Sequence, residues 1–483
     1  MTREEFKERL GFLMNCELTV GQLSASDTLY SFMGNRDKFS TFLLKGYAGT
    51  GKTTLISAFI KLLEEVKINT VLLAPTGRAA KVLSNYSGRH ASTIHKCIYR
   101  KKSTADPGSN FSLNYNNFKN TVFIVDEASM IGNAQNPENA FGSGRLLDDL
   151  LAYVFNDNNC RLILLGDSAQ LPPIGTVISP ALDENYLSAY GMTVFSCELS
   201  EVVRQDADSG ILFNATQLRK MMTDGNFNFP KLKCKGFPEI QSITGAELID
   251  EIENSYSRYG NDETRIICKT NKYANRYNMG IRNRILWREE ELSYGDLLMV
   301  VKNNYSWLPE NAEIDFIANG DMLEVLKVRR HYELYGHRYV DLYVRFVDFP
   351  DLEIEVKALL DTLAIDSAGM PSNYYKELWE QLEVDYQDIL DTKKRHEAIL
   401  KDPYYNALQI KYAYALTCHK SQGGQWKSVF IDHGWLNKEE ITDEGKYEFL
   451  RWLYTAITRA TEKLYLVNFD KEFLEEYFDG CKF

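Results

Sequence analysis

Several common features are missing from this sequence, and each absence excludes a class of protein. In its 483 residues no uninterrupted apolar run approaches the roughly 18 residues that a membrane-spanning helix needs. The N-terminus, MTREEFKERLGFLMNCELT, carries acidic residues and lacks the apolar block of a signal peptide. We therefore expect an intracellular protein that does not associate with membranes.

Closely spaced metal-binding or disulfide-forming residues are also absent. The chain has eight cysteines, but no CxxC pair and no cluster of histidines. Zinc ribbons and disulfide scaffolds both need closer spacing than this. The cysteines are therefore expected to be reduced thiols, most of them buried.

An excess of positive charge is missing as well. The formal net charge is −12, which excludes the basic coat of a histone-like protein. It does not exclude contact with nucleic acid, because a local groove of phosphate contacts is sufficient. Hydrophobic residues make up 44% of the chain and charged residues 25%, as in a globular protein. A chain of 483 residues is too long for one ordinary core, so we expect about two to four domains.

The most informative stretch that is present is GYAGTGKTT, residues 46–54. It follows the apolar run STFLLKG and precedes LISAFIKLLEEV, where apolar residues recur at helical spacing. A strand, a glycine-rich loop and a helix N-terminus in this order form a phosphate cradle, because loop N–H groups point at phosphate oxygens. This context argues against a chance glycine-rich turn. The loop is predicted to bind a nucleoside triphosphate, with Lys52 on the β- and γ-phosphates, Thr53 on Mg²⁺, and further contacts from Gly46, Ala48, Gly49, Thr50, Gly51 and Thr54.

Two later apolar runs end in polar residues suited to phosphate chemistry. In TVFIVDEASM, Asp126 is expected to hold Mg²⁺ through water, and Glu127 to orient or deprotonate the attacking water. In RLILLGDSAQLPPIG, Gln170 stands where a side-chain amide could sense the γ-phosphate. Alone, Gln170 is more simply a polar residue in a turn, and an acidic pair after a strand is weak evidence. Together with the phosphate loop, these residues predict a site for triphosphate hydrolysis.

These motifs, with those that follow, resemble the motifs of superfamily 1 helicases. More narrowly they resemble the RecD-like group with 5′→3′ polarity, which includes the Dda-type helicases of T-even phages. The resemblance extends from about Leu18 to about Val467. It implies an α/β fold with two tandem RecA-like P-loop NTPase domains, and ATP with Mg²⁺ as cofactors. It also implies binding to single-stranded DNA and to junctions of single and double strands.

The resemblance assigns roles to residues of the first half of the chain. LTVGQLSASDTLYSFM is similar to the Q motif, in which Gln22 would read the adenine edge by two hydrogen bonds. LLAPTGRAAKVL and ASTIHK are similar to motifs Ia and Ib, whose Thr76, Thr93 and His95 would contact the DNA backbone. For His95, a structural histidine with satisfied contacts is the competing interpretation.

Two arginines are implied as fingers that reach the γ-phosphate from the second domain. ELSEVVRQDADSGIL resembles motif IV and contains Arg204, while LYTAITRATEKLYLV resembles motif VI and contains Arg459. Such guanidinium groups stabilise the transferring phosphoryl group only when the cleft closes, which ties hydrolysis to domain movement.

YALTCHKSQGGQWKSVFID resembles motif V, and here one departure is visible. The resemblance implies that Thr417 and His419 touch DNA, and that Gln422 and Gly423 lie near the nucleotide. Relatives often carry a glutamate shortly after the QG of this motif, whereas this chain reads QGGQW, with Gln425. The roles of the residues after Gly423 are therefore open.

The expected first RecA-like domain covers residues 1–197. Within it, about residues 98–118 contain two short alternating segments around a DPGSN turn, which predicts a β-hairpin. In the resemblance this hairpin is the pin that splits the duplex, and Phe111 is our candidate for the tip residue that stacks on the last base pair. An ordinary exposed hairpin is the alternative.

The expected second RecA-like domain is split into residues 198–300 and 406–483. The insertion between them, residues 301–405, is strand-like in its first half and helical and polar in its second half. This pattern suits the SH3-like domain with a helical extension that the resemblance implies, which would hold the strand against the pin.

The sequence therefore predicts an ATP-dependent DNA helicase that translocates 5′→3′ on single-stranded DNA. Two alternatives remain open: a single-stranded DNA translocase that unwinds poorly, and an ATPase subunit of a recombination or repair complex. The expected protein is a monomer in the cytoplasm of a bacterium or of a phage-infected bacterium. Single-strand-binding, replication or repair proteins are its expected protein partners.

Overall fold

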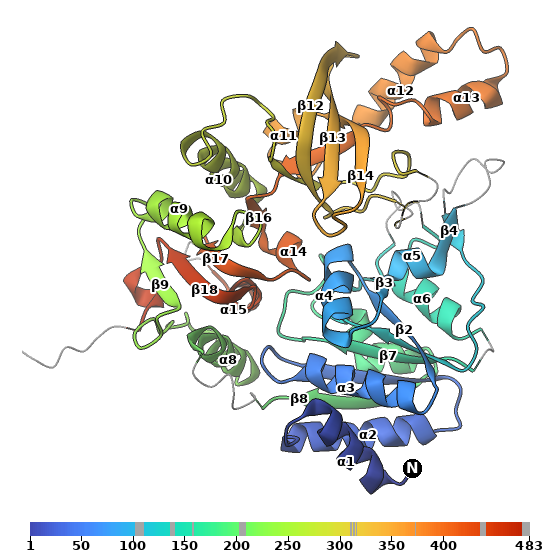
Figure 1. Cartoon of the computed structure of the whole chain (residues 1–483), viewed down its shortest axis with the longest axis vertical. Coiled ribbons are helices and arrows are strands. Elements are labelled where there is room, and N and C mark those ends of the chain that lie inside the picture. Colours follow the sequence, from blue (N-terminus) through green and yellow to red (C-terminus); the bar gives the residue numbers. More distant parts are fainter. Residues whose placement is uncertain are drawn as a thin grey trace, which may run out of the picture.

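The computed structural model describes residues 1–101, 111–135, 141–156, 159–201, 209–309, 312, 314, 316–371, 373–434 and 441–475. They form three parts in Figure 1: a first domain at the lower right, a second domain at the left, and a barrel at the top. Among the described residues, no helix is both long enough and apolar enough to span a bilayer.

The first domain is built on a six-stranded sheet whose neighbouring strands are all parallel. Its central strands are buried along nearly their whole length, as in parallel sheets that are covered on both faces. In spatial order the strands are β3 (Ala91–Thr93), β2 (Asn69–Ala74), β6 (Thr121–Val125), β7 (Arg161–Gly166), β1 (Ser40–Gly46) and β8 (Thr193–Leu199). The helical segments of this domain are α1 (Arg3–Met14), α2 (Val20–Gly34), α3 (Lys52–Glu65), α4 (Gly77–Ser87), α5 (Ile94–Ile98), η1 (Ala128–Met130), α6 (Leu146–Val154), η2 (Pro180–Leu182) and α7 (Glu184–Ala189).

The second domain is built on a five-stranded sheet, which is again parallel throughout. In spatial order its strands are β16 (Ala415–Thr417), β10 (Thr264–Cys268), β17 (Trp426–Asp432), β18 (Ala460–Val467) and β9 (Ile240–Ile243). Its helical segments are α8 (Gly210–Thr223), α9 (Leu248–Tyr259), α10 (Asn271–Arg284), α14 (Cys418–Ser421), α15 (Asp443–Ile457) and η4 (Lys471–Phe473). The predicted α/β architecture with parallel sheets is thus confirmed.

The barrel is closed by five strands and packs on the second domain. A buried ion pair of 3.0 Å between Arg282 on α10 and Asp296 fixes the start of the first barrel strand. The barrel strands are β11 (Leu297–Val300), β12 (Met322–Leu334), β13 (His337–Phe346), β14 (Glu353–Leu359) and β15 (Leu408–Tyr412). Between β14 and β15 lie α11 (Asp361–Ala364), α12 (Asn373–Asp385) and α13 (Thr392–Leu400), of which α12 and α13 project from the barrel in Figure 1.

The outer barrel strands extend beyond the insertion that we expected at residues 301–405. Residues 298–300 of β11 pair with residues 410–412 of β15, and this pairing closes the barrel. The sequence pattern did not reveal this, because a short buried strand has the same apolar pattern in either sheet. The last strand of the first domain, β8, likewise ends at Leu199 rather than at residue 197.

A two-stranded antiparallel sheet stands at the expected position of the hairpin. Its strands are β4 (Tyr99–Lys101) and β5 (Phe111–Leu113), in which Tyr99 pairs with Leu113 and Lys101 with Phe111. Residues 102–110, which join the two strands, lie outside the described residues.

Candidate nucleotide site and nucleic-acid interface

The phosphate loop has the geometry of an anion cradle. It joins the end of β1 at Gly46 to the start of α3 at Lys52. Gly49 and Gly51 have φ values of 73° and 72°, which only glycine adopts easily. Gly51 is the N-cap of α3 and offers no side-chain acceptor, so the N–H groups of the first turn remain for a ligand. Lys52 Nζ donates to the Gly46 carbonyl at 3.3 Å, which holds the ammonium group over the loop.

Buried carboxylates lie around Lys52 at the ends of β6 and β7. Burial raises the pKa of Asp126 to about 6, while the Lys52 ammonium group lowers it. Burial also raises the pKa of Asp167, and Lys52 again opposes the shift. Asp126 Oδ1 accepts a hydrogen bond from the Glu127 N–H at 2.8 Å, and Glu127 has a left-handed φ of 53°. This is a site of strongly perturbed charges, as functional sites often are.

Two side chains in this site have unused acceptors. Glu127 Oε2 and Gln170 Oε1 are buried and have no hydrogen-bond partner in the described part of the chain. A buried acceptor of this kind needs a donor, and a bound water supplies one. Among the described residues, no group of three or more His, Cys, Asp and Glu side chains could hold a metal ion alone. The site therefore fits a Mg²⁺–nucleotide and its attacking water, because Mg²⁺ on a nucleotide takes most ligands from phosphates and waters.

Tyr454 of α15 reaches from the second domain onto the phosphate loop. Its hydroxyl accepts a hydrogen bond from the Ala48 N–H at 2.9 Å and donates one to Asp167 Oδ2 at 2.6 Å. The side chain is 1% exposed, so the contact is shielded from water. One hydroxyl thereby joins the loop, a carboxylate at the end of β7 and the helix of the opposite domain.

Other contacts across the cleft surround this bond. Arg451, on the same helix, donates through Nε to the Gln170 carbonyl at 3.0 Å and through Nη2 to the Ser168 carbonyl at 2.9 Å. Thr455 Oγ1 accepts from the Leu171 N–H at 2.9 Å. Gln422, which was expected near the nucleotide, donates to the Leu171 carbonyl at 2.7 Å. The loop after β7 is thus held by residues of the second domain.

Arg459, the expected arginine finger, is 3% exposed and lies at this interface. Its guanidinium group donates to the carbonyl of Thr455 at 3.1 Å, the carbonyl of Gly424 at 3.1 Å and the hydroxyl of Thr458 at 3.2 Å. All of these acceptors belong to the second domain. Arg204, the other expected finger, lies outside the described residues.

Gln22 is brought to the phosphate loop, but its amide already has protein partners. Nε2 donates to the Thr50 carbonyl at 3.2 Å, and Oε1 accepts from the Thr19 N–H at 3.1 Å. One N–H of Nε2 and one lone pair of Oε1 remain for an adenine edge. The adenine role of Gln22 stays a prediction.

The threonines expected to contact DNA stand where strands end and helices begin. Thr76 and Thr93 are the N-caps of α4 and α5. Each hydroxyl accepts a hydrogen bond of 3.2 Å from a backbone N–H in the first turn of its helix. Thr417 precedes α14 and makes no capping hydrogen bond through its side chain. β2 and β3 are neighbours, so Thr76 and Thr93 share one edge of the first sheet, the edge where α/β domains bind ligands.

Phe111 is buried among aromatic rings, and His95, which is partly exposed, packs against the same cluster. The His95 ring centre lies 4.8 Å from that of Phe141, and burial lowers the pKa of His95 to about 4, so the ring is neutral. Phe111 is 3% exposed, with its ring centre 4.8 Å from those of Phe141 and Tyr305. This corrects the expectation that Phe111 is the hairpin tip. An aromatic residue at the start of β5 gains more from burial in this cluster than from exposure.

His419 lines a pocket of about 430 Å³ between the loop after β7 and α15. Lys269, Leu171 and Trp452 also line it. Burial lowers the pKa of His419, which favours an uncharged ring that can donate or accept one hydrogen bond.

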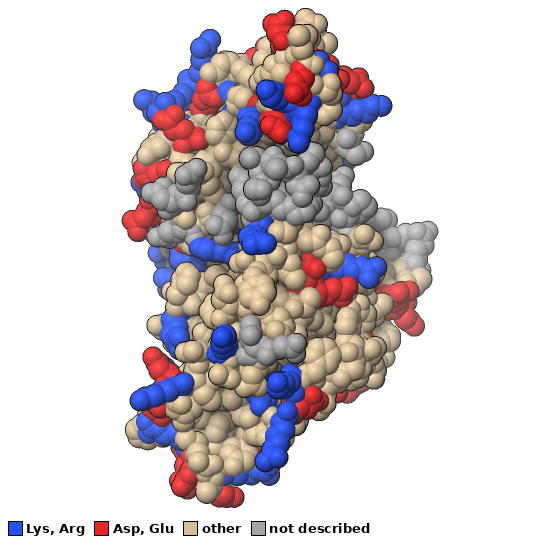
Figure 2. All heavy atoms as spheres, turned by 90° about the vertical axis from the view of Figure 1, so that its right-hand side faces the viewer, with Lys and Arg blue, Asp and Glu red and all other residues tan. Residues whose placement is uncertain are grey.

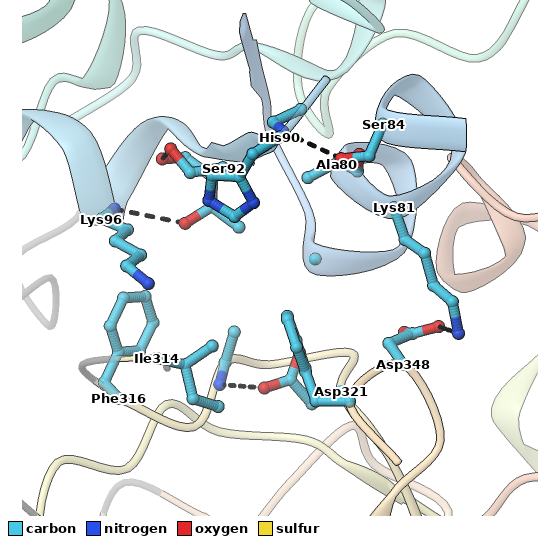
Figure 3. A pocket seen from close by; sticks show the side chains of 15 residues that line it. Ala80, Lys81, Ser84, His90, Ser92, Lys96, Ile314, Phe316, Asp321 and Asp348 are labelled. Carbon is cyan, nitrogen blue, oxygen red and sulfur yellow. Dashed lines mark hydrogen bonds and ion pairs between the residues drawn. The ribbon is translucent and has the colours of Figure 1, made fainter. Parts of the chain in front are cut away.

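A second pocket of about 430 Å³ lies between the first domain and the barrel (Figure 3). One wall carries lysines and hydroxyl groups, and the other carries apolar side chains and two carboxyl groups. Burial raises the pKa of Asp321 to about 7, which weakens its repulsion of a phosphate. This combination suits a nucleotide of a single strand, with cations for its phosphate and an apolar wall for its base. The lining residues labelled in Figure 3 include Lys81, Ser92, Lys96, Ile314, Phe316 and Asp321.

The face shown in Figure 2 carries no continuous basic band over its described part. Lys and Arg are scattered there among Asp and Glu. On this face, which agrees with the net charge of −12, phosphate contacts would depend on local groups rather than on a basic band.

Sequence reasoning missed Tyr454, Arg451 and Asp167. A signal was present for each. Arg451 and Tyr454 are three residues apart on α15, so they lie on the same face of the helix that leads to Arg459. Asp167 directly follows β7, as Asp126 follows β6.

Two family comparisons match the two domains. A family described as an AAA domain matches residues 18–231, and one described as a UvrD-like helicase C-terminal domain matches residues 412–467. The first match contains the phosphate loop and the carboxylates, and the second contains the contacts from Gln422 to Arg459.

Individual proteins are similar over different shares of the chain. The uncharacterized protein R530 of Acanthamoeba polyphaga mimivirus is 27% identical over 92% of this chain and 98% of its own length. The ATP-dependent DNA helicase dda of Enterobacteria phage T4 is 29% identical over 59% of this chain and 61% of its own. The ATP-dependent RecD2 DNA helicase of Deinococcus radiodurans is 32% identical over 35% of this chain and 20% of its own. The matched families and the order of the motifs identify the chain as a member of superfamily 1 helicases, of the RecD and Dda type.

Proposed function

We propose that this chain is an ATP-dependent DNA helicase that translocates 5′→3′ on single-stranded DNA and unwinds duplex DNA. The observation that carries the proposal is the Tyr454 hydroxyl, which joins the phosphate loop of one domain to motif VI of the other. A ligand bound at the loop therefore acts on the contacts between the domains. The family supports DNA as the substrate and 5′→3′ as the direction.

The proposed roles in the nucleotide site follow from chemistry and position. Lys52 holds the β- and γ-phosphates, and Thr53 and Asp126 hold the Mg²⁺ ion, Asp126 through water. Mg²⁺, when bound with ATP, neutralises phosphate charge. The unused acceptors of Glu127 and Gln170 accept hydrogen bonds from the attacking water and orient it, and the Glu127 carboxylate takes its proton. Arg459 exchanges its protein acceptors for phosphate oxygens as the cleft closes.

The proposed coupling between hydrolysis and movement runs through the loop after β7. Residues of the second domain hold this loop by its backbone, through Arg451, Thr455 and Gln422. The same loop contains Gln170, whose side-chain oxygen accepts no hydrogen bond from a described residue. A change at the γ-phosphate therefore alters contacts with the second domain, and the cleft opens or closes.

The proposed strand path runs over Thr76, Thr93 and Thr417 and through the pocket beside the barrel. Helix N-termini and hydroxyl groups hold phosphates without reading sequence, so we expect weak sequence preference. In this proposal the barrel is the SH3-like insertion, α12 and α13 are its helical extension, and the β4–β5 hairpin is the pin. The pocket in Figure 3 would hold the strand between the first domain and the barrel.

The test is strand displacement by the purified chain with ATP and Mg²⁺ on two duplexes that differ only in a 5′ or a 3′ single-stranded tail. Displacement from the 5′-tailed duplex alone is expected. Lys52→Ala serves as the matched control, because it should bind DNA and hydrolyse no ATP. Displacement from the 3′ tail alone would overturn the direction. DNA-stimulated hydrolysis without displacement would favour a translocase, or an ATPase subunit that needs its complex.

A further inference from the structure

A separate set of contacts joins the two domains at the start of β17. The guanidinium carbon of Arg78, on α4, lies 4.3 Å from the centre of the Trp426 ring. Arg78 Nη2 also donates to the Gln425 carbonyl at 2.8 Å. Trp426 is 1% exposed. We call these contacts the Arg78–Trp426 clasp.

The clasp is attached directly to Arg459. The Trp426 N–H donates to the Arg459 carbonyl at 2.9 Å. In return, Arg459 Nη1 donates to the Gly424 carbonyl at 3.1 Å. The segment from Gly424 to Trp426 therefore holds both the main chain and the guanidinium group of Arg459. A displacement of Trp426 must change the position of the arginine.

The two glycines of QGGQW lie so close to α4 and to Trp426 that neither position has room for a side chain. A Cβ atom on Gly424 would lie 2.7 Å from Cη2 of Trp426 and 3.0 Å from Nε of Arg78. A Cβ atom on Gly423 would lie 3.0 Å from the Thr76 hydroxyl. Only glycine lets the ring and the guanidinium group approach this closely. The stretch that departs from the motif V pattern is thus the stretch that contacts the first domain.

The electrostatic surroundings make the ring the main partner of Arg78. Burial lowers the pKa of Arg78, although Asp348, Glu263 and Asp262 raise it. Among the described residues, no carboxylate forms an ion pair with Arg78 within 4 Å. Trp426 is buried and Arg78 is partly exposed, and a guanidinium group is attracted more strongly to a ring removed from water than to an exposed ring. The clasp therefore favours the arrangement in which the two domain faces are in contact.

We propose that the Arg78–Trp426 clasp positions Arg459 for ATP hydrolysis. The inference rests on the proposed function, because it assigns positioning residues to that reaction. Arg78 and Thr76 begin the same helix, so a strand held at Thr76 acts on the segment that holds the arginine. Losing the clasp makes closure of the cleft less favourable, and turnover falls while ATP binding to the phosphate loop persists.

The experiment measures ATP turnover at saturating ATP and single-stranded DNA. Arg78→Ala is expected to lower kcat about tenfold, equivalent to about 1.4 kcal/mol, with little change in the Kd of a non-hydrolysable ATP analogue. Arg78→Lys keeps a cation over the ring but loses the planar fork, so its kcat should be intermediate. Gly424→Ala should lower kcat similarly and add little in the Arg78→Ala background. Arg258→Ala is the matched control, because that guanidinium carbon lies 5.0 Å from the ring of Tyr259 within α9.

Several outcomes would overturn the clasp. One is a kcat of Arg78→Ala within about twofold of the unchanged chain. Another is normal kcat at saturating DNA with weaker, less salt-dependent DNA binding, which would make Arg78 a phosphate contact. Absence of ATP hydrolysis by the unchanged chain would overturn the proposed function instead. The clasp is then judged by hydrogen exchange: Arg78→Ala should speed exchange in residues 423–427, and unchanged exchange there would reject it.

Discussion

At the scale of single residues, burial and the Lys52 ammonium group act in opposite directions on the pKa values of the carboxyl groups in the nucleotide site. Burial raises the pKa values of Asp126 and Asp167, and Lys52 lowers both. Removing Lys52 leaves this acidic group uncompensated, so the loss of hydrolysis in Lys52→Ala has two causes. The phosphates lose a cation, and the carboxylates lose the charge that keeps them ionised.

This balance predicts a pH dependence. The pKa of Asp126 is raised from 3.8 to about 6, so the folded site binds this proton more tightly than the unfolded chain. The stability gained from the proton is therefore lost as the pH rises from 3.8 to about 6. Activity moves in the opposite direction, because only ionised Asp126 holds the cation. We expect kcat/KM for the Mg²⁺ complex of ATP to fall about tenfold per pH unit below about 6. A profile that stays flat from pH ~7.5 to ~5 would contradict this.

Tyr454→Phe tests the hydroxyl that joins the domains. The change leaves the Ala48 N–H and one oxygen of buried Asp167 without their partner. An unsatisfied buried group costs about 1–3 kcal/mol, so we expect kcat to fall by about five- to a hundredfold. Tyr447→Phe on the same helix is the control, because that hydroxyl makes no hydrogen bond to a described residue. Equal ATP turnover in both variants would show that the hydroxyl is not needed for closure.

At the scale of elements, the hairpin is anchored by an aromatic cluster. Phe111 of β5 and Phe141 of the first domain pack against Tyr305 and Phe316, which precede the barrel strand β12. Ring centres in this cluster lie 4.8 to 6.2 Å apart. The hairpin is therefore attached through the start of β5 to the segment that leads into the barrel.

Phe111→Ala should separate unwinding from ATP hydrolysis. The deletion creates a cavity in the cluster, at a cost of about 3–5 kcal/mol, and loosens the attachment of β5. We expect strand displacement to fall more than about tenfold while single-strand-stimulated ATP turnover changes little. Phe6→Ala, which opens a comparable cavity between α1 and its neighbours, should lower stability without changing the ratio of the two activities. A similar fall in both activities for Phe111→Ala would make the cluster a general packing element.

The sequence predicted elements whose chemistry is local, and it missed contacts between distant segments. The phosphate loop, the Asp126 strand and the position of the β4–β5 hairpin follow from runs of neighbouring residues. The burial of Phe111 depends on Tyr305, Phe316 and Phe141, which no local pattern connects to it. Tyr454 was missed for the same reason, since its partner Ala48 lies 406 residues away in the chain. Barrel closure by β11 and β15 is another pairing of distant segments.

At the scale of the whole molecule, a chain with a net charge of −12 must hold a polyanion by a few local cations. The pocket beside the barrel supplies two of them, Lys81 and Lys96. Lys81 is already engaged, because its Nζ donates to the Val347 carbonyl at 3.3 Å and lies 3.9 Å from Asp348. Lys96 makes no ion pair with a described residue. It is therefore the stronger candidate for a phosphate contact.

Salt dependence measures this contact directly. Each cation that neutralises a phosphate of a single strand adds about 0.7 to the slope of log Kd against log salt. Lys96→Ala should therefore lower the slope by about 0.7, weaken binding at low salt, and approach the unchanged chain at high salt. Lys61→Ala, on the exposed face of α3 in the first domain, should leave the slope unchanged. If both variants bind with the unchanged slope, Lys96 does not contact a phosphate, and the strand does not pass through this pocket. If the slope falls equally in both variants, the strand is held by positive charge spread over the whole surface. The net charge of −12 makes this arrangement less favourable than a local phosphate contact.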